Sequence, residues 1–164
     1  MKSLARHRHA QSGAMLLEAL IAILIFSLGI LAIIGLQAQS IRNSSEAKYR
    51  SDASYLANQL IGRMWADRAN LATYAHRPGG TTVCSPTGTS AGTTTNVGRW
   101  MTSFTPTTAS ADANKPLLLP GATPNNQQVV IGPVVNNTRT VFIRICWVSP
   151  TGQHNYDVQT ILNF

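Results

Sequence analysis

The chain has 164 residues, of which only 12% are charged, and its formal net charge is +7. That length suits one domain with an appendage, because single domains commonly have about 100–200 residues. Three bases, Lys2, Arg6 and Arg8, lie close to the N-terminus, and the other ten are spread along the chain among six acids. Since nucleic-acid grooves need a basic stripe with interleaved aromatic side chains, we expect no nucleic-acid partner.

The N-terminal part consists of a basic leader and a long apolar run. Residues 1–13 are hydrophilic, and residues 14–36 are apolar or small with the single exception of Glu18. A helix over 14–36 would be about 35 Å long, enough to span a hydrocarbon core of about 30 Å. The leader charges would stay in the cytoplasm by the positive-inside rule, which places the rest of the chain outside.

Two ordinary interpretations of this run leave features unexplained. A secretory signal peptide would have an apolar region of about 7–15 residues, shorter than this one, although a weak site permits cleavage after Ala38. A plain transmembrane anchor explains the length and the topology. It does not explain Glu18, because a carboxylate at the centre of a membrane helix costs about 2.5–3.5 kcal/mol.

A third interpretation accounts for every feature of the run. The string Gly13-Ala14-Met15-Leu16-Leu17-Glu18 resembles the processing motif of type IV prepilins and the related pseudopilins. The resemblance implies cleavage between Gly13 and Ala14 by a membrane-embedded prepilin peptidase, followed by N-methylation of Ala14. The family usually has Phe directly after the cut, so Ala14 is a departure that bears mainly on methylation.

The position of Glu18 has a physical rationale once the leader is removed. Cleavage would create a new amino terminus at Ala14, one helical turn before Glu18. A buried acid is costly unless it is paired, and in a filament the available cation is the terminal amine of a neighbouring subunit. Such a pair would fix the axial register of packing, a role that the resemblance also implies. The alternative is a solitary Glu18 that reaches water at the membrane interface.

Residues 37–77 predict a second, amphipathic half of the same helix. No proline occurs between Met1 and Arg77, and Glu46 and Arg50 form a favourable i,i+4 pair. The sequence His76-Arg77-Pro78-Gly79-Gly80 is typical of a helix end. A helix over 14–73 would be about 90 Å long. Five residues recur at the spacing of one helical face: Tyr49, Ala53, Leu56, Leu60 and Met64.

Residues 78–164 predict a loop-rich β head that ends in a hairpin. Residues 139–148 and 156–163 alternate between apolar and polar side chains and predict two antiparallel strands joined by a turn at 149–155. Residues 127–135 predict a third strand, which Gly132-Pro133 either interrupts or places at a sheet edge. The segment 97–104 fits a short helix or a strand. The apolar face of the hairpin should pack on the amphipathic helix.

The only cysteines, Cys84 and Cys146, follow the apolar run. One cysteine pair in an exported chain favours a disulfide, which would close a loop of about 60 residues and contribute roughly 4 kcal/mol. Cys146 belongs to the strand face opposite the apolar one, where the Gly/Thr/Ser-rich loop 78–96 could reach it. The alternative is two buried thiols.

The residues that usually carry catalysis or bind metals are scattered. The four histidines and two cysteines have no metal-ligand spacing, so we expect no metal and no cofactor. Only Asp112 and Asp157 are acidic after residue 70, and no nucleophile–base arrangement is visible. We therefore expect no catalytic residues and no enzyme, with an anchored periplasmic enzyme as the weaker alternative.

The predicted fold class is α+β, with a transmembrane half-helix (14–36), an amphipathic half-helix (37–77) packed on a small antiparallel sheet, and a head (78–164). This is the arrangement of the type IV pilin-like fold. Within that family the chain resembles PilV-type minor pilins most, through four features: MLLEALIAILIFSLGILAIIGLQ, YLANQLIGRMWADRAN, LPGA and the final hairpin with ICWV.

This resemblance implies a low-abundance subunit that primes or caps type IV pilus assembly and supports adhesion and twitching motility. Its implied partners are the prepilin peptidase, other minor pilins, the major pilin, a tip adhesin and the assembly platform. It implies a single-pass protein of the bacterial inner membrane, surrounded by lipid before assembly, with a periplasmic head, and later a place in the pilus fibre or its tip. The alternatives are a minor pseudopilin of a type II secretion system and a DNA-binding uptake pilin.

Overall fold

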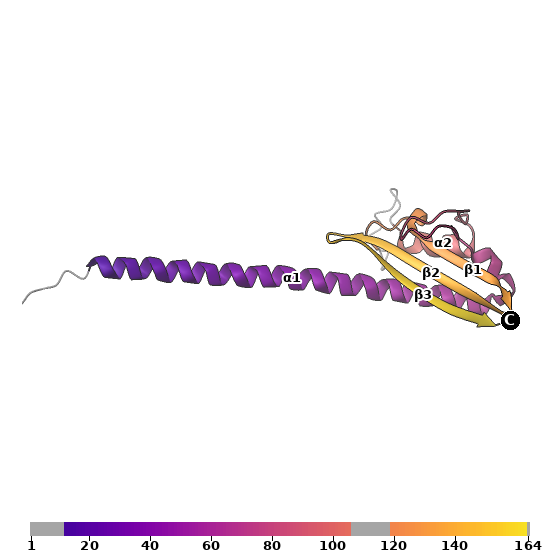
Figure 1. The fold of residues 1–164 in the computed structure, drawn as a ribbon, viewed down its shortest axis with the longest axis horizontal. Coiled ribbons are helices and arrows are strands. Elements are labelled where there is room, and N and C mark those ends of the chain that lie inside the picture. The colour runs from indigo at the N-terminus through magenta and orange to yellow at the C-terminus, as the bar shows by residue number, and fades with distance from the viewer. Residues whose placement is uncertain (1–11, 106–118, 164) are drawn as a thin grey trace, which may run out of the picture. The chain divides into compact units, whose positions relative to one another are not determined.

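A computed structural model of the chain describes residues 12–105 and 119–163 (Figure 1). The chain divides into two compact units, residues 1–45 and 46–164. From here on the second unit is called the head; it is larger than the head expected from the sequence (78–164), because it includes the last part of the long helix. The long helix contributes to both units. It is followed by a three-stranded antiparallel sheet, so the architecture is α+β as predicted. The elements in chain order are α1 (Ser12–Ala66), η1 (Arg68–Tyr74), α2 (Asn96–Phe104), η2 (Pro124–Asn126), β1 (Gln128–Val135), β2 (Thr138–Ser149) and β3 (Gly152–Asn163).

The described part of the first unit is helical throughout. Every residue from Gly13 to Ser44 is exposed, and the helix α1 is long and apolar enough to cross a membrane. The helix continues through Gly29 and Gly35. It contains no proline, so no residue within it lacks a backbone N–H. The predicted apolar half-helix is therefore present.

The helix α1 ends earlier than the sequence predicted. It stops at Ala66 rather than continuing to residue 77, and the 3-10 helix η1 follows it. The Asp67 carboxylate accepts hydrogen bonds from Asn70 Nδ2 at 2.7 Å and from the Tyr74 hydroxyl at 3.2 Å. Asp and Asn side chains compete in this way with helical backbone bonding. The helix thus ends at this local network and not at Pro78.

The three strands form one antiparallel sheet in the order β1-β2-β3. The pairing of β2 with β3 runs without interruption from Thr138↔Asn163 to Ser149↔Gly152. The connecting turn is therefore Pro150-Thr151 alone, shorter than the predicted 149–155. Gly152 has a φ of 129°, which only glycine adopts readily, so the chain can reverse within this tight turn.

Strand β1 confirms the prediction for residues 127–135. It lies at the edge of the sheet, and its register with β2 shifts between Ile131 and Val134. Pro133 has no N–H to donate to a ladder, so this residue is tolerated at an edge with an irregularity. Of the two predicted consequences of Gly132-Pro133, the edge position is therefore present, whereas the strand itself continues through these residues with only a shift of register.

The core of the head lies between α1 and the sheet, as predicted. Ala53, Leu56, Leu60 and Met64 are buried, and Tyr49 is partly buried against the same cluster. They belong to one cluster with the inward face of β2: Val141, Ile143, Ile145 and Trp147.

The segment 97–104 is a helix, α2, and not a strand. The side chain of Thr95 caps it by accepting a hydrogen bond from the Gly98 N–H at 3.0 Å. Trp100 is fully buried, and its Nε1 donates to the carbonyl oxygen of Leu56 on α1 at 3.0 Å. This bond ties α2 to the long helix.

Cys84 and Cys146 form a disulfide, which confirms that prediction. Their Cα atoms are 5.7 Å apart, and 62 residues separate them in sequence. Cys146 neighbours the inward-facing Ile145 and Trp147 on β2, so its side chain points to the opposite face of the sheet. The disulfide fastens the loop after η1 to that face.

Candidate functional site

The predicted processing motif lies in the first turns of α1. Gly13 and Ala14 are helical and exposed, and a Cβ added at Gly13 would meet no atom within 4 Å. No described side chain therefore crowds Gly13. The leader charges Lys2, Arg6 and Arg8 lie outside the described residues, so cleavage and methylation stay predictions.

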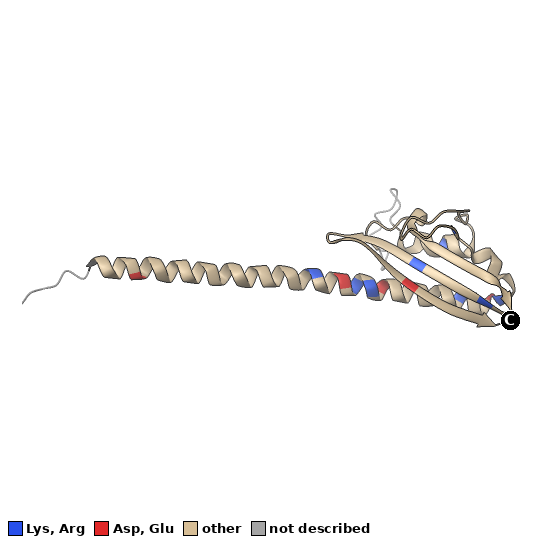
Figure 2. Cartoon of the chain, in the orientation of Figure 1, with Lys and Arg blue, Asp and Glu red and all other residues tan. Residues whose placement is uncertain are grey.

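Glu18 is the only charged residue of the apolar half of the helix. It is exposed, and no further charge occurs along α1 before Arg42 (Figure 2). No described residue offers Glu18 a hydrogen bond or an ion pair. Since Ala14 precedes it by four residues, the two side chains lie on the same helix face. A cation brought to the N-terminal end of this face could pair with the carboxylate.

Large apolar side chains surround Glu18 and cover the helix on all sides. Ser27 does not break this surface, because its hydroxyl donates to the Ile23 carbonyl oxygen at 2.7 Å. Such an area of exposed apolar surface requires cover from lipid or from other apolar helices. The exposed large residues of this segment are Met15, Leu16, Leu17, Leu20, Ile21, Ile23, Leu24, Ile25, Phe26, Leu28, Ile30, Leu31, Ile33, Ile34 and Leu36.

A second polar cluster, in the head, joins α1 to the turn between β2 and β3. The Glu46 carboxylate accepts a hydrogen bond from Thr151 Oγ1 at 2.9 Å and lies 3.5 Å from His154 Nε2. The predicted pair with Arg50 is thus replaced by partners from the hairpin. The Ser149 hydroxyl lowers the pKa of Glu46, and Thr151 and His154 act in the same direction against the effect of burial.

This cluster contains the residue types of a hydrolase triad but not the geometry. Ser149 Oγ lies 3.1 Å from His154 Nε2, the same ring nitrogen that faces Glu46. A working triad needs the acid on one ring nitrogen and the nucleophile on the other. Because Ser149 and Glu46 both face Nε2, they compete for one ring nitrogen. The cluster therefore connects α1 to the hairpin through polar contacts.

Sequence reasoning missed the role of His76, which it assigned to the exposed end of a helix. The residue is fully buried, its Nε2 lies 2.7 Å from the Pro124 carbonyl oxygen, and its Nδ1 accepts from the Ala91 N–H at 2.9 Å. The backbone of His76 also bridges to Val129 of β1. Burial lowers the pKa of His76, which keeps the imidazole neutral. No local pattern in the sequence indicates this position.

Groups that could hold a metal ion are absent from residues 12–105 and 119–163, where no three His, Cys, Asp or Glu side chains gather. Glu46 and His154 form one pair of such groups. Two side chains are too few for a structural metal site, which normally has four ligands.

No protein-family model, no curated protein and no solved structure matches this chain. The class of protein therefore follows from the fold and the site alone. It is an α+β protein with a long, apolar N-terminal helix capable of spanning a membrane, a small antiparallel sheet and a disulfide. This combination is compatible with a type IV pilin-like fold.

Proposed function

We propose that the chain is a minor pilin, a structural subunit that primes or caps type IV pilus assembly together with other minor pilins. One observation carries the proposal: an exposed apolar helix with a single acid, Glu18, four residues after Ala14. A plain anchor would gain nothing from that acid. A subunit that moves from lipid into a helical bundle would gain a charged group that can pair with a neighbouring subunit.

The proposed mechanism depends on a change of surroundings for Glu18. In the inner membrane the carboxylate lies close enough to the interface to remain hydrated. After cleavage at Gly13, the free amine of Ala14 on a neighbouring subunit becomes its partner in the filament. In the pair each charge compensates the other inside the apolar bundle. Because the pair can form in only one axial register, that register is favoured over the others.

The head would supply the contacts that distinguish this subunit from its neighbours. Its disulfide and its core between α1 and the sheet support a rigid body on which exposed loops are displayed. In this proposal the prepilin peptidase processes the chain, and the partners are other minor pilins, the major pilin, a tip adhesin and the assembly platform. The head would face the periplasm first and the pilus fibre or its tip later.

The test is deletion of the gene in the bacterium that carries it. We expect loss of surface pili and of twitching motility, with type II secretion unaffected. Loss of secretion with normal pili would instead identify a minor pseudopilin of a type II system. Loss of DNA uptake alone, with normal pili, would identify an uptake pilin.

Complementation with Glu18→Ala tests the mechanism. We expect normal membrane insertion and normal cleavage at Gly13, with at least a tenfold loss of the subunit from sheared pili, measured by immunoblot. The matched control is Ser27→Ala, which changes the same exposed helix without removing a charge. Normal incorporation of Glu18→Ala would contradict the register mechanism.

A further inference from the structure

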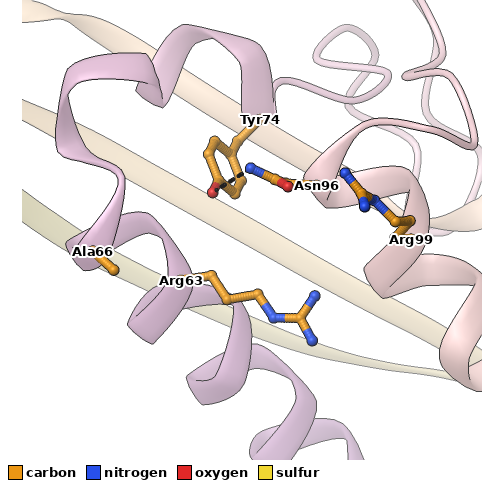
Figure 3. A pocket seen from close by; sticks show the side chains of 5 residues that line it. All are labelled: Arg63, Ala66, Tyr74, Asn96 and Arg99. Carbon is orange, nitrogen blue, oxygen red and sulfur yellow. Dashed lines mark hydrogen bonds between the residues drawn. The ribbon is translucent and has the colours of Figure 1, made fainter.

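A hollow in the head separates the end of α1 from α2. It has a volume of about 330 Å³, within the range of small-ligand sites, and is lined by Arg63, Ala66, Tyr74, Asn96 and Arg99. Figure 3 shows Arg63 extending from α1 toward this space and Arg99 reaching it from α2. Two guanidinium groups from separate elements therefore line one hollow.

Both arginines are exposed, and neither guanidinium group has a hydrogen-bond, ion-pair or ring partner within the part of the chain that the structure describes. The Asp67 carboxylate accepts hydrogen bonds from Asn70, Tyr74 and Asn96, and the described residues show no ion pair between it and either arginine. The other acids of the head also have partners elsewhere: Glu46 with His154, Asp52 with Lys48, and Asp157 with Arg144. Asp112 lies outside the described residues. The guanidinium groups of Arg63 and Arg99 are therefore accessible to an external anion.

The wall between the two arginines is fixed in position. Asn96 Nδ2 donates to the Tyr74 hydroxyl at 3.1 Å and to Asp67 at 3.3 Å, and the Tyr74 hydroxyl donates to Asp67. Both Nδ2 hydrogens of Asn96 are therefore used inside the wall. Since the side-chain donors of Asn96 and Tyr74 already have acceptors within the wall, the charged groups that would hold an anion in the hollow are Arg63 and Arg99.

The geometry favours a tetrahedral anion over a planar one. A guanidinium group presents a planar fork that one carboxylate satisfies in a bidentate pair. Two forks that arrive from different helices are better matched by a phosphate group, whose oxygens point in several directions. A single-stranded nucleic acid fits less well, because Tyr74 is buried and offers no face for stacking.

The exposed Trp65 does not change this conclusion. It is two residues from Arg63 on the helix, so it lies on a different face, and Arg68 already covers its ring at 5.9 Å.

We propose that the hollow between α1 and α2 is a binding site for a phosphate group, held by Arg63 and Arg99. The volume exceeds that of the ion alone, which leaves room for a small phosphomonoester.

The site is tested by titrating the full chain in nonionic detergent with inorganic phosphate at constant ionic strength. Binding is followed through the Nε–Hε resonances of the arginines. We expect saturable shifts at Arg63 and Arg99, and at least a tenfold weaker affinity in Arg63→Gln and in Arg99→Gln, since each removes a charge-assisted pair. Arg68→Gln is the matched control, from the same region but outside the hollow, and should bind as the unchanged chain does.

Two further arms complete the experiment. Arg63→Lys and Arg99→Lys keep the charge without the fork, and we expect their affinities to fall between those of the unchanged chain and the Gln variants. Glycerol 3-phosphate replaces inorganic phosphate in the second arm: tighter binding identifies an ester as the ligand, and equal binding identifies the free ion. Absence of saturation with both probes, or an equal loss in Arg68→Gln, would overturn the proposal.

Discussion

The imidazole of His76 has both of its nitrogens committed within the head. The Ala91 N–H donates to Nδ1, so this nitrogen carries no proton, and Nε2–H donates to the Pro124 carbonyl. A second proton would have to displace the Ala91 bond inside a buried site. The neutral form of His76 therefore joins three segments: the end of η1, the loop around Ala91, and the residues before β1.

Acidification should destabilise the head through His76. Burial lowers the folded-state pKa of His76 below its ordinary value of 6.5, so the unfolded chain binds the extra proton first as pH falls. Stability is therefore fully present above about pH 6.5 and declines as pH falls from there toward the folded-state pKa. We expect the thermal unfolding midpoint, followed by circular dichroism, to be lower at pH 5.5 than at pH 7.5.

The matched variants for this prediction are His76→Gln and His154→Gln. The first should be less stable at pH 7.5 but should lose most of the difference between the two pH values. The second changes a partly exposed imidazole and should keep that difference. An unchanged pH dependence in His76→Gln would show that another group is responsible.

Trp100 offers a second prediction at the scale of one residue. Trp100→Phe removes the Nε1 bond to Leu56 and part of a fully buried ring, so it should lower the free energy of unfolding by about 1–3 kcal/mol. Trp65→Phe is the control, because Trp65 is 41% exposed, and it should change stability by less than about 0.5 kcal/mol. Equal effects in urea unfolding would contradict the assigned role of Trp100.

At the scale of elements, the disulfide Cys84–Cys146 closes a long segment of the chain that contains α2, η2 and β1. For a separation of 62 residues the loss of unfolded-state entropy corresponds to about 4 kcal/mol. Replacing both cysteines by serine should lower the free energy of unfolding by roughly that amount, measured by urea titration. A reducing agent should destabilise the unchanged chain and leave the double variant unaffected. A stable double variant would mean that the loop is held mainly by its hydrogen bonds.

The elements themselves could be predicted wherever a long periodic pattern extends along the sequence. The buried face of α1 from Ala53 to Met64 and the alternation along β2 are such patterns, because one side of each element packs against the core. The element ends could not be predicted in the same way. Asp67 and Asn70 end α1 through local bonding, and Gly152 shortens the hairpin turn, and both depend on conformations that periodicity does not encode.

The candidate sites differ in the same respect. Gly13, Ala14 and Glu18 form one contiguous motif, so their relation is visible in the sequence. The hollow at Arg63 and Arg99 is assembled from segments that only the folded head brings together. His76 was missed for the same reason, because its partners Ala91 and Pro124 lie far along the chain.

At the scale of the whole molecule, the two units have opposite surfaces. The first unit exposes its apolar side chains from Met15 to Leu36, whereas the head has a core in which apolar side chains are buried in one cluster. The head also forms a disulfide, which persists in an oxidising compartment. The proposed function would place the first unit in lipid or in a helical bundle and the head in water. The proposed cut between Gly13 and Ala14 would shorten the first unit at its N-terminal end.

The most direct test of the account is the mass of the N-terminal peptide of the protein isolated from membranes. In cells that contain the prepilin peptidase we predict a chain that begins at Ala14, with or without one methyl group. In cells that lack the peptidase we predict that residues 1–13 are retained. A chain that begins at Gln39, or one that keeps its leader when the peptidase is present, would contradict the central claim.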